Sequence, residues 1–130
     1  MAYEVAIVTG GSRGIGREIA RALARRGAAV VVVYTGDQIA AEAVVDQILA
    51  ADGTALAVRA DVSDELDVER LFDETEAMLG GVDLVVHGAM RDPAVVDRHA
   101  ARRLAPGGTI VGRAELAAFL GAVRPFTRGG

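Results

Sequence analysis

The chain has 130 residues, of which 52% are hydrophobic and 25% charged, with a formal net charge of −4. This length suits one domain with a buried core, and the apolar content excludes an intrinsically disordered chain. Charges of both signs are scattered along the sequence, which excludes a basic nucleic-acid-binding face, and the lack of cysteine excludes disulfides and thiolate metal sites.

The first half of the chain predicts strands that alternate with helices. Residues 5–9 form a compact apolar strand, which a glycine-rich turn follows at residues 10–16. Apolar residues then recur at helical spacing, and residues 29–34 are a continuous β-branched run, as expected of a strand covered on both faces. Asp37 is placed to cap a helix over residues 38–51.

The second half continues this alternation, and Ser63 is placed to cap its first helix. The predicted elements are, in order, a strand over residues 54–60, a helix that ends at Gly80, a strand over 82–89, a helix over 93–104, a strand over 109–111 and a helix over 114–123. The fold class is therefore α/β, a Rossmann-like, doubly wound parallel sheet of about five strands. We expect one domain over residues 1–130.

The strongest motif is TGGSRGIG at residues 9–16. It follows the first predicted strand and opens the first helix, which is the context that a diphosphate-binding turn requires. Glycines let the backbone approach a diphosphate closely, and a helix N-terminus offers N–H groups at the positive end of its dipole. The motif predicts a dinucleotide site, and the alternative is a tight turn that binds no ligand.

The spacing Thr-Gly-x-x-x-Gly-x-Gly resembles that of the short-chain dehydrogenase/reductase family. Asp61-Val62 stands where the family has an Asp-hydrophobic pair beside the adenine, and residues 85–90 (VVHGAM) stand where it has Asn-Asn-Ala-Gly. The resemblance spans residues 3–111 and is to the N-terminal half of a 3-oxoacyl reductase-like member. It implies a truncated, degenerate dinucleotide-binding domain, in which the final helix and tail over residues 112–130 lie outside the resemblance.

The cofactor is expected to be NADP(H) rather than NAD. An acidic residue at the end of the second strand would bind the ribose 2′-OH of NAD, but Tyr34 and Thr35 stand there. Arg13 lies in the glycine loop, where many NADP-using family members have a basic residue, and its guanidinium suits a 2′-phosphate. Asp37 lies too far along to indicate NAD. The predicted cofactor-binding residues are Gly10, Ser12, Arg13, Gly14, Ile15, Gly16, Tyr34, Thr35, Asp61, Val62, Gly88 and Ala89.

The catalytic groups that the resemblance implies are absent from this sequence. The family uses a Tyr as proton donor, a Lys four residues later and a Ser upstream of the Tyr, and in the family these follow the fifth strand. Here all 14 basic residues are Arg, Tyr occurs only at positions 3 and 34, and Ser only at 12 and 63. Tyr3 precedes the first strand at the wrong edge of the sheet, and Tyr34 lies beside the adenosine half. We therefore predict no catalytic residue.

The two histidines of the sequence are candidate functional groups. His87 ends the fourth predicted strand and is interpreted as a hydrogen-bonded structural residue, the alternative being a proton donor. His99 is expected on the solvated face of its helix. Two isolated histidines do not make a metal site, so no metal is predicted.

Three functions follow from these observations. The first is an NADP(H)-binding module that acts as a non-catalytic partner or regulatory subunit of a full-length reductase. The second is a subunit of a heteromeric NADP-dependent ketoreductase whose partner supplies Tyr and Lys, and the third is a remnant or truncation without function. An exposed fifth strand predicts a homodimer or a heteromer with a full-length family member. With no signal peptide and no membrane-spanning run, a cytoplasmic protein without nucleic-acid or membrane partners is expected.

Overall fold

The computed structural model describes residues 4–89 and 91–123. Its elements are, in chain order, β1 (Val5–Thr9), α1 (Gly14–Arg25), β2 (Ala29–Tyr34), α2 (Gln38–Ala50), β3 (Thr54–Arg59), α3 (Glu65–Leu79), β4 (Leu84–His87), α4 (Ala94–Arg103), β5 (Thr109–Val111), the 3-10 turn η1 (Arg113–Glu115) and α5 (Leu116–Val123). The predicted alternation of strands and helices is confirmed. Tyr3, the last residue of the VVHGAM motif and the end of the chain over 124–130 lie outside the described residues.

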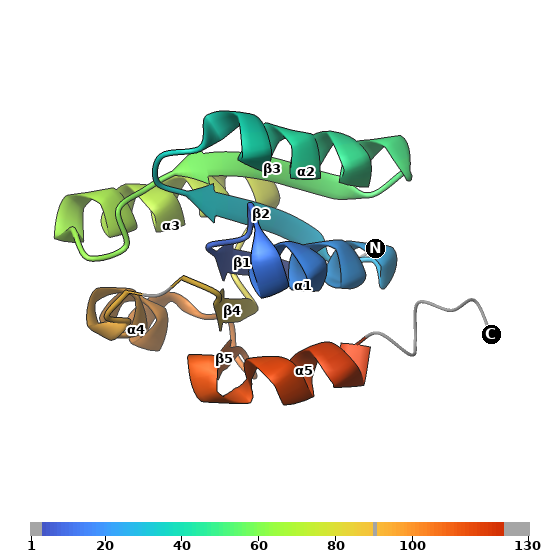
Figure 1. Cartoon of the computed structure of the whole chain (residues 1–130). Helices are drawn as coiled ribbons and strands as arrows, with labels where there is room; N and C mark the ends of the chain where they lie inside the picture. Colours follow the sequence, from blue (N-terminus) through green and yellow to red (C-terminus); the bar gives the residue numbers. More distant parts are fainter. Residues whose placement is uncertain (1–3, 90, 124–130) are drawn as a thin grey trace.

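The five strands form one parallel sheet in the order β3-β2-β1-β4-β5 (Figure 1). The chain builds outward from β1 through β2 to β3, then crosses back to place β4 on the other side of β1. Thr9 at the end of β1 pairs in register with Val33 of β2 and His87 of β4. The carboxyl ends of these strands therefore meet at the point where the strand order reverses, which is where open α/β sheets bind ligands. The doubly wound fold is confirmed.

Two apolar cores lie on opposite faces of the sheet, because alternate strand residues point to opposite sides. Val8, Val30 and Val86 face the core under α1, α2 and α5, whereas Ile7 and Val31 face the core under α3 and α4. Burial on both faces explains why β1, β2 and β4 are continuous apolar runs. In the part of the chain that the structure describes, no helix is both long and apolar enough to cross a membrane.

The start of α3 differs from the prediction. Ser63 was expected to be the N-cap, but Asp64 takes that position and accepts a hydrogen bond from the Leu66 N–H at 3.4 Å. The N–H and hydroxyl of Ser63 instead donate to Oδ1 of Asp61, at 3.0 and 2.7 Å. Asp61 forms a local turn with Ser63 just before the helix, and this turn takes the Ser63 hydroxyl away from the capping position.

The expectation that His99 is solvated was wrong. Its side chain is buried between α4 and α3, where it stacks on Phe72 and lies 3.0 Å from Oε1 of Glu65. Burial, together with the nearby Arg102 and Arg103, lowers the pKa of His99 even though Glu65 contacts its ring. The helix pairing explains the error, because a face that looks polar in the sequence of α4 is the face that packs on α3.

The last helix closes one face of the sheet. Leu116, Leu120 and Val123 of α5 are buried in the core that α1 covers, and α5 packs against α1 (Figure 1). The predicted helix over residues 114–123 is therefore present, with its first turn in the tighter η1 form. This helix shields β4 and β5 on the α1 side.

Candidate functional site

A cavity of about 650 Å³ opens at the carboxyl ends of β1, β2 and β4. This volume lies within the range of about 300 to 1,000 Å³ that is typical of small-molecule sites. The lining residues are Gly10, Ser12, Arg13, Val33, Tyr34, Thr35, Gly36, Asp37, Ala60, Val62, Gly88 and Ala89. The cavity therefore joins the glycine loop, the end of β2 and the end of β4.

Beside this cavity, backbone packs closely against backbone. A Cβ added to Gly16 would lie 2.3 Å from the carbonyl oxygen of Gly10, and one added to Gly88 would lie 2.4 Å from that of Thr9. Gly10 has a φ of +63° and faces the backbone of residues 88 and 89 at a similarly close approach. Only glycine fits at these contacts, so the loop and the end of β4 pack tightly while the space beside them stays open.

Hydrogen bonds hold the three strand ends together around the cavity. The Thr9 hydroxyl donates to the Val86 carbonyl at 3.4 Å and accepts from the Ala89 N–H at 3.3 Å. The Gly11 N–H donates to the Val33 carbonyl at 3.3 Å. Thr9 is buried and does not line the cavity, so its role is to position the backbone of residues 88 and 89.

The N-terminus of α1 has no side-chain cap. Arg13 occupies the N-cap position without a side-chain bond to the helix, and the first turn carries no acidic residue. By contrast, Asp37 caps α2 and Asp64 caps α3. No side chain of the helix start accepts from the first-turn N–H groups of α1, so the positive end of the helix dipole is available to an anion. This is the electrostatic requirement of a diphosphate site.

An ion pair lies across the cavity. Nη2 of Arg13 is 2.8 Å from Oδ2 of Asp37, and both residues line the cavity. Oδ1 of Asp37 accepts a hydrogen bond from the Ala40 N–H at 3.0 Å, so the predicted helix cap is present. Sequence reasoning missed that Asp37 also lines the cavity. The available signal was its position, because α2 begins soon after β2 ends.

The predicted cofactor-binding residues fall into three sets. Those that line the cavity are Gly10, Ser12, Arg13, Tyr34, Thr35, Val62, Gly88 and Ala89. Gly14, Ile15 and Gly16 belong to the first turn of α1. Asp61 does not line the cavity. Its bonds from Ser63 and, to a lesser degree, the nearby Arg91 lower the pKa of the Asp61 carboxyl.

Besides Asp37, the sequence analysis missed the wall formed by Val33, Gly36 and Ala60. These residues lack chemical groups that mark a site, so no motif identifies them. That the gathered residues bind a dinucleotide stays a prediction.

The two side chains weighed as proton donors lie in different surroundings. His87 is buried, and its Nε2 lies 2.7 Å from Oδ1 of Asp97 in α4. Tyr34 is half-buried at the end of β2 and lines the cavity. His87 thus links β4 to α4, and Tyr34 is the one tyrosine among residues 4–89 and 91–123.

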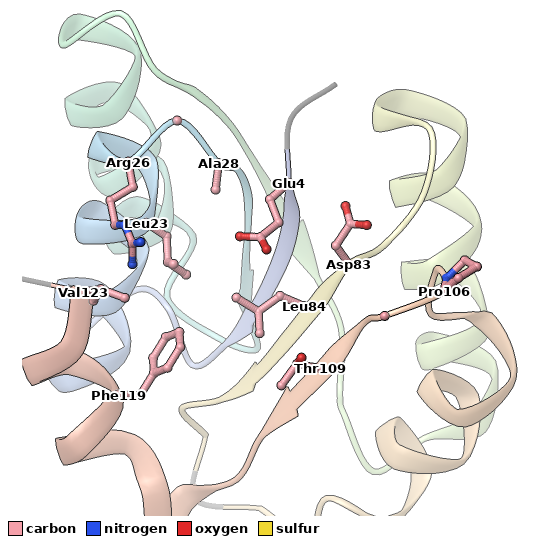
Figure 2. Close-up of a pocket in the computed structure, with 12 residues that line it drawn as sticks. Glu4, Leu23, Arg26, Ala28, Asp83, Leu84, Pro106, Thr109, Phe119 and Val123 are labelled. Atoms are coloured by element: carbon pink, nitrogen blue, oxygen red, sulfur yellow. The ribbon is translucent and has the colours of Figure 1, made fainter. Parts of the chain in front are cut away.

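A second cavity, of about 680 Å³, opens at the opposite edge of the sheet (Figure 2). Glu4 and Asp83, which precede β1 and β4, approach it from the sheet, and Phe119 approaches it from α5. Oδ2 of Asp83 accepts a hydrogen bond from the Val5 N–H at 2.8 Å, which fastens the two strands together. This cavity lies at the amino ends of the strands, away from the ligand-binding edge of a parallel sheet, so we do not assign the dinucleotide site to it.

Comparison with known proteins agrees with this geometry. The family model described as short chain dehydrogenase matches residues 4–103. The chain is 46% identical over 86 residues to an uncharacterized oxidoreductase of Methylorubrum extorquens, which covers 66% of this chain and 35% of that protein. It therefore spans about a third of the length of that relative.

Solved structures show the same likeness. A dehydrogenase/reductase from Sinorhizobium meliloti is 38% identical with a TM-score of 0.76, over 86% of this chain and 54% of that one. A metagenomic short-chain oxidoreductase in complex with NADP is 30% identical with a TM-score of 0.70, over 84% of this chain and 61% of that one. With the glycine loop, the strand order and the match over residues 4–103 in agreement, the chain belongs to the short-chain dehydrogenase family.

Proposed function

We propose that this chain is an NADP(H)-binding domain that does not reduce a carbonyl by itself and serves as a non-catalytic partner or regulatory subunit of a full-length reductase. The observation that carries the proposal is an open cavity beside an intact glycine loop, on a sequence that contains no lysine. Membership of the family supports the fold and the kind of ligand. The absence of lysine from this sequence supports the lack of carbonyl reduction.

The residues present fit a dinucleotide. The uncapped start of α1 and the glycine loop would hold the diphosphate, and Arg13 would pair with a 2′-phosphate. Tyr34, Thr35 and Val62 would flank the adenosine half, and Gly88 and Ala89 would lie against the other ribose. The related metagenomic oxidoreductase has been solved with NADP, which supports this choice of cofactor.

When bound, NADPH supplies a hydride to a carbonyl carbon. The protein must then give a proton to the developing alkoxide. His87 is turned to Asp97 of α4, Tyr34 stands at the β2 end of the cavity, and the sequence contains no lysine to place beside that phenol. These placements support binding without chemistry.

The edge of the sheet favours a second function. β5 pairs only with β4 among the described strands, and its Thr109 and Ile110 are exposed. A partner that covered this edge and supplied Tyr and Lys would make the chain one subunit of a heteromeric oxidoreductase. Activity found only in a mixture with a full-length family member would identify this second function.

Calorimetric titration of the purified chain with NADPH and with NADH tests the proposal. We expect tighter binding of NADPH, and in Arg13→Ala a loss of NADPH affinity of about tenfold or more with NADH affinity little changed, because one charge-assisted contact is removed. Arg17→Ala, an exposed arginine of α1 that does not line the cavity, is the matched control. Absence of binding by the folded chain, or turnover of a ketone with NADPH by the chain alone, would overturn the proposal.

A further inference from the structure

We propose that Asp37 competes with the 2′-phosphate of NADP(H) for Arg13, so that the Arg13–Asp37 pair, and not Arg13 alone, sets the preference between NADP(H) and NAD(H). This inference rests on the proposed function. It concerns two residues that lie 24 positions apart and meet only in the folded chain.

The Arg13–Asp37 pair lies in the lining of the proposed nucleotide cavity. Arg13 is the N-cap residue of α1 and Asp37 is that of α2, and their side chains meet with Nη2 and Oδ2 at 2.8 Å. They are the charged residues among those that line the 650 Å³ cavity. The local charge that a ligand meets is therefore the sum of one guanidinium and one carboxylate, not a bare cation.

The two partners are held to different degrees. Asp37 is anchored, because its Oδ1 accepts the Ala40 N–H at 3.0 Å, and turning the carboxylate away would uncap α2. Arg13 has no side-chain bond to its own helix, and its side chain is 70% exposed. When a phosphate enters, Arg13 is therefore the group that moves, while the carboxylate remains in place.

This asymmetry acts against NADP(H). A 2′-phosphate that draws Arg13 from Asp37 breaks one ion pair to make another and comes to lie near an uncompensated carboxylate, which repels it. The 2′-OH of NAD(H) is uncharged and is able to donate a hydrogen bond to a carboxylate. Arg13 thus favours binding of the phosphate and Asp37 opposes it. The preference of the chain for NADP(H) over NAD(H) is therefore smaller than Arg13 alone predicts.

The substitution Asp37→Asn separates charge from capping, because Asn caps helices about as well as Asp. We expect its NADPH affinity in calorimetry to rise about 3- to 10-fold, while its NADH affinity stays the same or falls. The control is Glu42→Gln, one turn along α2, where the exposed carboxylate accepts a hydrogen bond from Gln38 and does not line the cavity. Thermal unfolding followed by circular dichroism establishes that each variant is folded.

A double-mutant cycle tests competition itself. If Asp37 acts through Arg13, Asp37→Asn raises NADPH affinity less in the Arg13→Ala background than in the wild type. Equal gains in both backgrounds, or no gain in Asp37→Asn while the wild type binds NADPH, would overturn the inference and leave the proposed function standing. Folded wild type and variants that bind neither nucleotide would overturn both.

Discussion

Gly14 and Gly16 are two residues apart, and each is required for a different physical reason. At Gly14 the backbone has a φ of +59°, a region that side chains disfavour, although an added Cβ would meet nothing within 4 Å. At Gly16 an added Cβ would strike the Gly10 carbonyl oxygen at 2.3 Å. The first glycine supplies a conformation and the second supplies a close contact between the loop and α1.

These two residues give a matched prediction. Gly14→Ala should lower the free energy of unfolding by about 1–2 kcal/mol, the cost of a left-handed residue with a Cβ, and should weaken NADPH binding less than Gly16→Ala does. Gly16→Ala should push the loop from the helix and abolish measurable NADPH binding, because the collision is with backbone. Urea unfolding and calorimetric titration measure the two effects. Wild-type affinity in Gly16→Ala would contradict the account of the loop.

At the scale of elements, one arginine joins α4 to α3. Arg103 donates from Nε and Nη2 to both carboxylate oxygens of Glu76, at 3.1 and 2.9 Å, and from Nη2 to Asp73 at 2.6 Å. Its guanidinium also lies over the Phe72 ring, and its side chain is 20% exposed. The hydrogen bonds that Arg103 donates to Glu76 are the largest cause that raises the pKa of Arg103, so its guanidinium stays charged.

Removing the Arg103 side chain should weaken the packing of α4 on α3. Arg103→Ala is expected to lower the free energy of unfolding by about 1–3 kcal/mol, since it breaks charged hydrogen bonds in a partly buried site and leaves Glu76 without this partner. Arg98→Ala, which removes an ion pair with Glu65 that is about half exposed, should cost less than about 1 kcal/mol. Urea denaturation of both variants measures the difference. Equal destabilisation by the two would show that α4 is not held through Arg103.

In the molecule as a whole, helices cover both faces of the sheet, but no further strand among the described residues covers its edge at β5. α5 packs beside α1 and buries Leu116, Leu120 and Val123, whereas the outer side of β5 has no partner strand among the described residues. Ile110 on this strand is 37% exposed. An apolar edge strand favours pairing with another chain.

We therefore predict that the chain self-associates through β5 and that Ile110→Lys shifts it toward monomer, because a charged side chain opposes edge pairing. Sedimentation velocity over a range of protein concentrations measures the shift. Ile39→Lys, on an exposed position of α2, is the control and should leave the assembly unchanged. Identical sedimentation of wild type and Ile110→Lys would argue against pairing at this edge.

The helices, the strands and the glycine loop could be predicted from local patterns of residues. Strands follow from continuous apolar runs and helices from apolar residues spaced three to four apart. Both signals are local, and β1, β2 and β5 have the bounds that their apolar runs predict. The loop at residues 10–16 could also be predicted, because a turn that requires glycine is recognised by the spacing of its glycines. The predicted residues that line the cavity come from segments where one strand ends and the chain turns.

Which distant side chains meet became clear from the folded chain and not from local patterns. Folding brought Asp37 to Arg13, buried His99 against Phe72 and placed α5 on the face that α1 covers. A residue pattern fixes the face that an element buries, but not the element that it buries that face against. Pairings of this kind depend on strand order and helix packing, which the chain reaches only when all its segments are folded together.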